Sequence, residues 1–571
     1  MKTYLSNLFS DFLLSFWKHY VLWSFIFITY FCALYAFLFY QIHGSLFYVD
    51  TDCYTRALRI VDWLQNFEWQ EKIFPYSNYP DGFILHFTRI NDVIWLILSL
   101  PFMTIFSLKD AVFYGGFFFS PFFLFLTIIS LLWGIKPFLN STKNNAKLFL
   151  AIFAISFTFC CKLSHTFDFY RPDHHSFMCF IFTFSLSALL RSYNKQNIKE
   201  LFWAGILTGI GLWVSSAPEG LYVAFIFLLI LCVDCIFRKQ NTILPLFYSL
   251  GLFYATTAAW LINPPYGGYA TLDNARLSVI HVLLTSLILL SFAILYFGHF
   301  KSKIKKTAIL SISAVSSVLF MLCIFGSDKL FAQIYDEPVL KYFVPYINEM
   351  KGMLAINVFL LPTIIIGIFI FALLPFKNSY SLSMFLLYCM TAPLSVAVVR
   401  FYQYYLVVWL FLYSFGLILL FNNKDADDKH KLLAFIYLVW PIFYLTAFDY
   451  NPVKLYIPQV HGVILTDTFR GPELIWERNA NTVSSPYHTN VKGIQDNHIM
   501  WFTSDENQLK EFLRKRKVKY IHLPEMVNSE YYVNPEDNLD KLYGKVITGK
   551  NIYPWMTKTD ERTYLVNYNK F

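Results

Sequence analysis

The feature that most constrains this chain is a series of long apolar runs that recur from residue 20 to residue 447. A helix needs about 17–25 predominantly apolar residues to cross the hydrocarbon core of a bilayer. Because 57% of the residues are hydrophobic and only 15% are charged, the composition does not suit a soluble globule. The chain is therefore predicted to be a polytopic α-helical membrane protein.

The apolar runs predict about thirteen transmembrane helices. The first run is too long for a cleavable signal and is expected to remain as a helix. The run 93–108 is short and broken at Pro101, so we assign it to the first outer loop and do not count it as a span. The predicted spans are 20–42, 112–135, 147–163, 176–190, 200–217, 220–237, 242–262, 277–299, 307–326, 354–376, 381–399, 402–421 and 432–447.

The basic residues indicate how these helices are oriented. With a cytoplasmic N-terminus, nearly every inner loop carries Lys or Arg, as the positive-inside rule requires. Examples are Lys143, Arg191, Arg238, Lys303 and Lys429. This distribution accounts for the net charge of +9 without a nucleic-acid partner, and it places the C-terminal part of the chain outside the cytoplasm.

The chain is expected to have two domains. From Asn451 onward, short apolar runs alternate with polar and turn-forming residues, which predicts a small soluble α/β domain. We expect a membrane domain over 1–447 and a periplasmic or otherwise extracytoplasmic domain over 448–571, in a multi-pass protein of the inner (plasma) membrane. All nine cysteines except Cys53 lie in or beside apolar runs, so no disulfide framework or zinc site is predicted.

Ionisable side chains gather at the outer ends of the predicted helices. Carboxylates and an imidazole from separate loops can bind Mg²⁺ or Mn²⁺, and an arginine at the membrane boundary can hold a phosphate through two hydrogen bonds. The candidates are Asp50 and Asp52 in the first outer loop, Arg171, Asp173, His174 and His175 in the second, Glu219 between two later helices, Glu349 in a later outer loop and Arg400 at the start of the twelfth helix.

Local structural roles remain open for several of these residues. Asp50 or Asp52 can cap a helix, with Arg56 as an i,i+4 partner, and Asp173 can cap the next helix. Arg400 is different, because a charge within otherwise apolar sequence is costly and is a functional candidate by default. The occurrence of all these residues on one predicted face favours a functional site.

Four short motifs around these residues resemble those of the oligosaccharyltransferase catalytic subunits, which are membrane glycosyltransferases of the GT-C fold. Thr51-Asp52-Cys53-Tyr54 is similar to the acidic motif of the family's first outer loop, and Asp173-His174-His175 to its Asp-x-His motif. Tyr346-Ile347-Asn348-Glu349 stands where the family has Thr/Ser-x-x-Glu, and Val399-Arg400-Phe401-Tyr402 resembles the segment with its phosphate-contacting arginine.

The resemblance implies a GT-C fold, a reaction and a role for each matched residue. Asp52, Asp173 and His175 would bind the metal, Asp52 and Glu349 would be catalytic by orienting the acceptor, and Arg400 would bind the donor phosphates. The implied reaction moves a sugar or oligosaccharide from a polyprenyl-phosphate or polyprenyl-pyrophosphate donor to an extracytoplasmic acceptor. That acceptor would be a glycan, a lipid or a protein.

The C-terminal domain departs from the family pattern. Where the family has Trp-Trp-Asp-Tyr-Gly, which grips the acceptor hydroxyl, this chain reads Thr466-Asp467-Thr468-Phe469. We therefore expect a divergent bacterial-type member whose acceptor is not an Asn-x-Ser/Thr peptide. The alternative from another class is a transporter or flippase, although the sequence has neither an internal repeat nor paired broken helices in matching halves.

Overall fold

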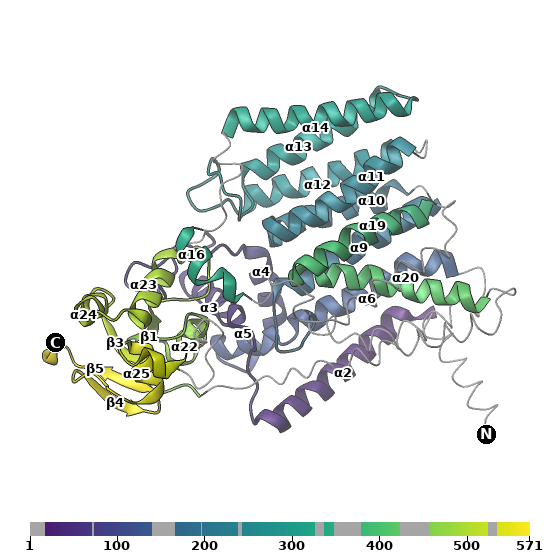
Figure 1. Ribbon diagram of the computed structural model, residues 1–571. Coiled ribbons are helices and arrows are strands. Elements are labelled where there is room, and N and C mark those ends of the chain that lie inside the picture. The colour runs from purple at the N-terminus through teal and green to yellow at the C-terminus, as the bar shows by residue number, and fades with distance from the viewer. Residues whose placement is uncertain are drawn as a thin grey trace, which may run out of the picture. The chain divides into compact units, whose positions relative to one another are not determined.

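The computed structural model describes residues 18–70, 73–139, 166–195, 197–237, 242–325, 336–347, 379–422, 456–523 and 534–571. The chain forms two compact units, which are described separately (Figure 1). The first unit comprises Met1–Ile42, Phe117–Ala332 and Lys351–Asn451. The second comprises His43–Gly116, Gln333–Met350 and Pro452–Phe571. The predicted domain boundary near residue 448 lies outside the described residues.

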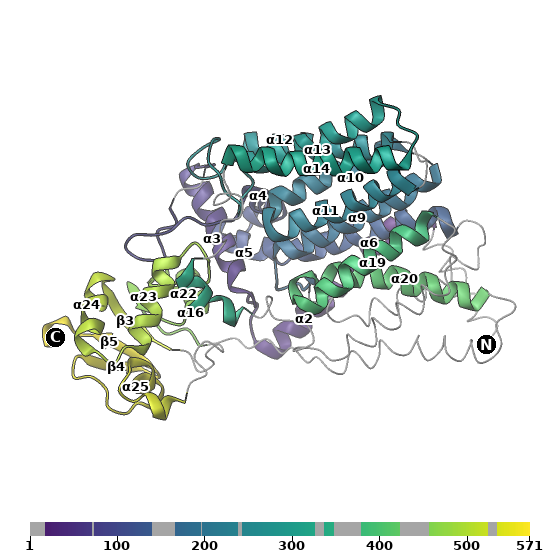
Figure 2. The ribbon, with the colours of Figure 1, turned by 45° about the horizontal axis from the view of Figure 1, so that its top comes forward.

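The first unit is a bundle of long apolar helices that run side by side in both views (Figures 1 and 2). Within the described residues, seven helical segments are long and apolar enough to cross a membrane. This confirms the prediction of a many-pass helical membrane protein, whereas the predicted spans 147–163, 354–376 and 432–447 lie outside the described residues. The helices are α2 (Tyr20–His43), α6 (Phe119–Leu139), α9 (His174–Lys195), α10 (Ile198–Val214), α11 (Leu221–Phe237), α12 (Ile243–Ile262), α13 (Val279–Phe297), α14 (Lys303–Phe325), α19 (Ser379–Ala397) and α20 (Tyr402–Asn422), with the short turns η2 (Ser216–Gly220) and η5 (Val399–Phe401).

Close packing of α10 on α12 is possible because glycines lie at their contact. A Cβ atom at Gly205 would lie 2.0 Å from the carbonyl oxygen of Tyr248, and one at Gly251 would lie 2.2 Å from the carbonyl oxygen of Phe202. Small residues let helix backbones approach closely where lipid offers no hydrophobic driving force for association. The Gly205 and Gly209 pair, four residues apart, forms such a contact face on α10.

The predicted span 112–135 lies within one candidate membrane span, Leu108–Pro137, in which the helix is interrupted between α5 and α6. Helix α5 (Leu108–Gly116) ends at a glycine pair, and α6 begins at Phe119. A Cβ atom at Gly116 would lie 2.3 Å from the Tyr48 hydroxyl and 2.4 Å from the Trp95 ring, so this close approach requires glycine. Glycine also disfavours continuation of the helix.

The run 93–108 does not form a membrane span. Helix α4 (Arg89–Ser99), which has 11 residues, covers only the first part of this run, and it is followed by the turn η1 (Phe102–Thr104). At a rise of 1.5 Å per residue, α4 is about 17 Å long, which is too short for a bilayer core. The sequence-based assignment of this run to a loop region agrees with the structure.

The second unit contains the predicted small α/β domain. Its five-stranded sheet has the order β2-β1-β3-β5-β4, in which β1 pairs in parallel with β2 and β3, and β5 pairs antiparallel with β3 and β4. Helices pack on this sheet around buried side chains such as Trp501 and Leu509. The elements of this unit after α5 are α16 (Glu337–Tyr342), η3 (Val344–Tyr346), β1 (Val463–Leu465), η6 (Thr468–Arg470), α22 (Gly471–Arg478), β2 (Asn481–Thr482), α23 (Val491–Phe502), α24 (Glu506–Lys515), β3 (Val518–His522), η8 (Pro535–Asn538), α25 (Leu542–Thr548), β4 (Met556–Asp560), β5 (Thr563–Val566) and η9 (Tyr568–Lys570).

Segments from two predicted outer loops form part of this second unit. The buried Arg516 donates to the carbonyl oxygens of Asn78 and Tyr79, each at 3.1 Å, and pairs with Asp496 at 2.6 Å. Helix α16 packs on α23, and Phe343 stacks on Phe469 with ring centroids 5.5 Å apart. The first outer loop, which includes α3 (Thr51–Asn66), therefore shares a core with the C-terminal domain.

Candidate active site

Polar side chains from three parts of the first unit meet where its helices begin or end. Asp173 directly precedes α9, Glu219 lies in η2 between α10 and α11, and Arg400 lies in η5 directly before α20. The three side chains are joined through His174 and His175 at the start of α9. Residues separated by up to 227 positions in the sequence thus form one largely buried group, which we call the α9 cluster: Asp173, His174, His175, Glu219 and Arg400.

Asp173 and the two histidines can hold a metal ion. Their candidate ligand atoms all lie within 4.8 Å of one another, and all three residues are buried. The Oδ2 atom of Asp173 lies 3.4 Å from Nε2 of His175, and its Oδ1 atom lies 2.5 Å from Nδ1 of His174. One carboxylate with imidazoles suits borderline divalent cations such as Mn²⁺ or Zn²⁺.

Asp173 also makes local hydrogen bonds at the start of α9. Its Oδ1 atom accepts from the backbone N–H of His174 at 2.6 Å, and its carbonyl oxygen accepts from the hydroxyl of Ser176 at 2.9 Å. Burial alone would raise the pKa of Asp173, but His174, His175 and Arg171 together hold the pKa well below its usual range. The carboxylate is therefore ionised, which is the form that binds metal.

Glu219 has partners in α9, in η5 and at the start of α20. Its side chain is fully buried. Its Oε1 atom lies 2.5 Å from Nε of Arg400 and 3.1 Å from Nδ1 of His175, and its Oε2 atom accepts from the Tyr404 hydroxyl at 2.7 Å. A buried charge is tolerated where it is paired and hydrogen-bonded, and Glu219 meets that condition.

Arg400 contributes two of its nitrogens to the cluster. In addition to the bond from Nε to Glu219, its Nη2 atom lies 3.1 Å from Nε2 of His174. The Arg400 side chain is 17% exposed, so it is not fully enclosed by the protein. A guanidinium at the edge of a buried group is the kind of side chain that recognises phosphate in proteins.

The candidates of the first outer loop lie in the second unit. Asp50 caps α3, accepting from the backbone N–H of Asp52 at 3.1 Å, so the capping role predicted as one alternative is the one found. Asp52 lies in the first turn of α3, near Tyr487. Burial, together with the Asp52 carboxylate, raises the pKa of Tyr487 well above its usual value, and the Tyr487 hydroxyl donates to Thr55 at 2.7 Å.

Two further sequence predictions have different outcomes. Glu349 lies outside the described residues. The segment that departs from the family pattern forms the end of β1 and the turn η6, where Asp467 accepts from the backbone N–H of Phe469 at 2.8 Å. The Thr468 hydroxyl accepts from Asn497 at 2.8 Å. Asp467 and Thr468 therefore contribute to the fold of the domain, whereas the buried hydroxyl of Thr466 has no hydrogen-bond partner among the described residues.

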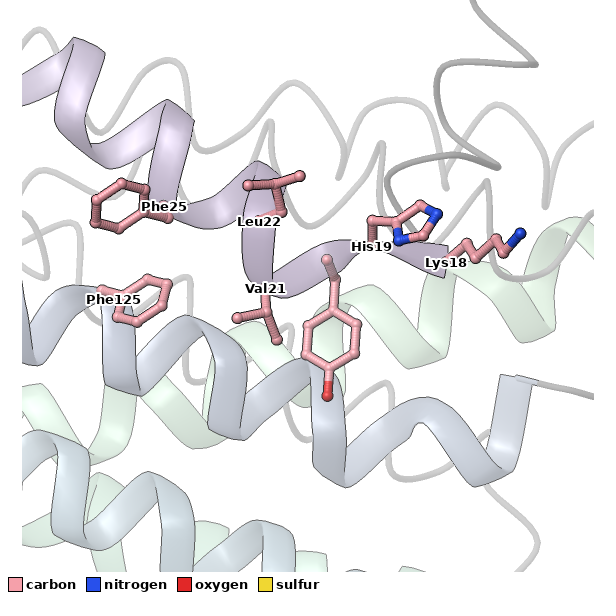
Figure 3. Close-up of a pocket in the computed structure, with 7 residues that line it drawn as sticks. Lys18, His19, Val21, Leu22, Phe25 and Phe125 are labelled. Atoms are coloured by element: carbon pink, nitrogen blue, oxygen red, sulfur yellow. The ribbon is translucent and has the colours of Figure 1, made fainter.

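The first unit also contains a pocket whose lining residues do not belong to the α9 cluster. Figure 3 shows this pocket beside the N-terminal end of α2, with Phe125 of α6 on its other side. Phe25 and Phe125 form an edge-to-face pair with centroids 6.0 Å apart. The lining is largely apolar and includes no residue of the α9 cluster, so this pocket is not the candidate site.

Comparison with known proteins identifies the fold. No protein-family model matches the sequence, and no curated protein matches it. In structure, the chain matches the oligosaccharyltransferase of Archaeoglobus fulgidus tethered to an acceptor peptide with an NVT sequon, with a TM-score of 0.60 and 14% identity over 89% of this chain and 69% of that one. It also matches the complex of that oligosaccharyltransferase with Zn and sulfate, with a TM-score of 0.57 and 14% identity over 83% of this chain and 63% of that one.

These matches establish the class of fold. The chain has the architecture of an oligosaccharyltransferase, and the family resemblance predicted from its short motifs is confirmed at the level of the fold. The chain spans about two thirds of the length of the structures that it matches.

Proposed function

We propose that this protein is a metal-dependent membrane glycosyltransferase. It transfers a sugar or oligosaccharide from a polyprenyl-phosphate or polyprenyl-pyrophosphate donor to an acceptor outside the cytoplasm. The observation that carries the proposal is the α9 cluster, in which metal-ligand candidates and an arginine share one buried group. The oligosaccharyltransferase fold favours this function over the transporter alternative.

The chemistry of transfer requires such a set of residues. When the bond between the sugar's anomeric carbon and the phosphate oxygen breaks, negative charge develops on the lipid phosphate. Asp173 and His175 would hold Mg²⁺ or Mn²⁺, which neutralises that charge when bound. Arg400 would donate hydrogen bonds to the phosphate oxygens, as arginines do in phosphate recognition.

The acceptor side of the reaction is assigned by the family resemblance. Asp52 is proposed to orient the acceptor and to complete the metal coordination, and Glu349 is proposed to polarise the acceptor nucleophile. Where a hydroxyl attacks, a carboxylate such as Asp52 would take its proton.

The acceptor class can be tested by peptide transfer. The peptide bound to the A. fulgidus protein favours a protein acceptor, but Asp467 and Thr468 already make hydrogen bonds within their domain. A recognition site that lacks the donors of the family's tryptophan-rich motif loses most discrimination for a substrate hydroxyl. We therefore propose a glycan, a lipid-linked saccharide or a protein site chosen by other features.

The experiment supplies purified protein with a labelled polyprenyl-linked sugar and one of two peptides. One peptide contains an Asn-x-Thr sequon, and the matched peptide has Ala in place of Thr. The proposal predicts no preference for the sequon peptide. Transfer to the sequon peptide alone would show that this chain is an N-glycosylating enzyme that recognises the Thr hydroxyl through other residues.

A further inference from the structure

Glu219 connects the two functional halves of the α9 cluster. We infer that Glu219 is a positioning residue that orients both the metal ligand His175 and the phosphate-binding Arg400. This inference rests on the proposed function, since it assigns a role within the same site.

The first step concerns the ring of His175. Its Nδ1 atom lies 3.1 Å from Oε1 of Glu219, and its Nε2 atom lies 3.4 Å from Oδ2 of Asp173. With the proton on Nδ1, the ring donates to Glu219 and directs the Nε2 lone pair towards the Asp173 carboxylate. Ligand atoms bound to one ion at about 2.1 Å lie roughly 3.0–3.4 Å apart, so Nε2 and Oδ2 have suitable separation for one shared metal.

The second step separates His174 from His175. The Nδ1 atom of His174 lies 2.5 Å from Oδ1 of Asp173, and its Nε2 atom lies 3.1 Å from Nη2 of Arg400. Because arginine can only donate, Nε2 accepts and the proton lies on Nδ1, directed at Asp173. Both nitrogens of His174 are therefore engaged in hydrogen bonds, and His175 is the imidazole suited to the metal.

The third step concerns how Glu219 itself is held. While Oε1 contacts Arg400 and His175, Oε2 accepts from Tyr404 at 2.7 Å and from Gln403 at 3.4 Å. Gly220 directly follows, where a Cβ atom would lie 2.4 Å from the carbonyl oxygen of Ser215. The carboxylate is thus fixed by the first turn of α20 on one side and by a tightly packed turn in its own backbone.

The arrangement has a known physical consequence for metal sites. A carboxylate that accepts from the far nitrogen of a ligating histidine fixes the ring tautomer and orientation, and its loss typically weakens metal affinity about 10–100-fold. The same carboxylate restrains the Arg400 guanidinium through Nε, and Nη2 of Arg400 lies 3.1 Å from Nε2 of His174. One residue would therefore set the geometry of metal and donor together.

The test measures Mn²⁺ affinity by electron paramagnetic resonance titration of the full-length protein in detergent. We expect Glu219→Gln to weaken Mn²⁺ binding by about 10–100-fold and to raise KM for the lipid-linked donor. Glu219→Asp keeps the buried charge while withdrawing the carboxylate from His175 and Arg400, and it should weaken Mn²⁺ binding about tenfold or more. Glu200→Gln is the matched control, because Glu200 pairs with Arg191 at 2.9 Å outside the cluster, and its Mn²⁺ affinity should equal that of the wild type.

The possible results separate the inference from the function on which it rests. Folded Glu219 variants that bind Mn²⁺ as tightly as the wild type would overturn the positioning role alone. A wild-type protein that does not bind Mn²⁺ would overturn both the positioning role and the proposed metal dependence. Retention of the wild-type thermal transition identifies the variants that are folded, and Glu219→Asp supplies the result if Glu219→Gln does not fold.

Discussion

His174 and His175 are neighbours in the sequence and both contact Asp173, but their shortest contacts beyond Asp173 differ. His174 bridges Asp173 and Arg400, whereas His175 bridges Asp173 and Glu219. Sequence analysis could select Asp173 and His175 because the Asp-x-His spacing is a local pattern. It could not rank Glu219, because the partner Arg400 is 181 residues away and only the fold brings the two together. The one signal for Glu219 in the sequence was a charged residue between two apolar runs.

At Arg400, charge alone is not expected to be sufficient. Lysine keeps the positive charge but has neither the planar fork nor the Nε–H that contacts Glu219. We expect Arg400→Lys to raise KM for the lipid-linked donor and to lower kcat/KM by about tenfold or more. Steady-state kinetics with a labelled donor measure this effect.

Arg191→Lys is the control for this substitution, because Arg191 pairs with Glu200 elsewhere in the first unit. It should keep the wild-type kinetics. Wild-type donor kinetics in Arg400→Lys would remove Arg400 from the phosphate-binding role.

At the scale of elements, predicted helix ends agree with the structure where length and hydrophobicity determine them. They disagree where a tertiary contact determines where a helix ends. The predicted spans 20–42 and 277–299 correspond to α2 and α13 within two residues at each end, because length and hydrophobicity define them. The break between α5 and α6 was missed, because it depends on the contact of Gly116 with Tyr48 and Trp95. No periodicity in the local sequence contains that information.

The contact between α10 and α12 leads to a stability prediction. In Gly205→Ala the new methyl group would lie 2.0 Å from the carbonyl oxygen of Tyr248, so the two helices must separate. We expect the free energy of unfolding to fall by about 1–3 kcal/mol. In Gly211→Ala, also in α10, the nearest atoms are ends of Met178 and Ile181 side chains at 3.4 Å and 3.5 Å. This variant should be neutral or stabilised by up to about 1 kcal/mol through helix propensity.

Unfolding in detergent by denaturant titration compares the two variants directly. The opposite signs distinguish a packing effect from a general effect of replacing glycine. Equal stability changes would show that the close approach of α10 and α12 does not limit the residue at position 205.

For the whole molecule, the sequence indicated a membrane part followed by a small α/β domain, and both are present. It did not indicate that residues 43–116 form one unit with the C-terminal domain. That association depends on contacts between residues distant in sequence, such as those of Arg516 with Asn78 and Asn490 with Ser77. Hydropathy and local pattern do not report such contacts.

We predict the orientation of the whole chain from the basic residues of its loops. Reporter fusions at Lys143, Lys195, Lys303 and Lys429 should indicate the cytoplasm, and fusions after Asn451 should indicate the opposite side. The physical reason is the excess of Lys and Arg in the predicted inner loops. A cytoplasmic C-terminus would contradict both the predicted helix count and the extracytoplasmic acceptor.

The most direct measurement is transfer of a labelled sugar from a polyprenyl-linked donor, using purified protein with the endogenous acceptor fraction. We predict transfer that requires Mn²⁺ or Mg²⁺ and that falls by well over tenfold in Asp173→Asn and His175→Ala, with Glu200→Gln retaining wild-type activity. Full transfer in excess chelator, or in the folded His175→Ala variant, would contradict the account and leave these residues with their helix-capping and packing roles.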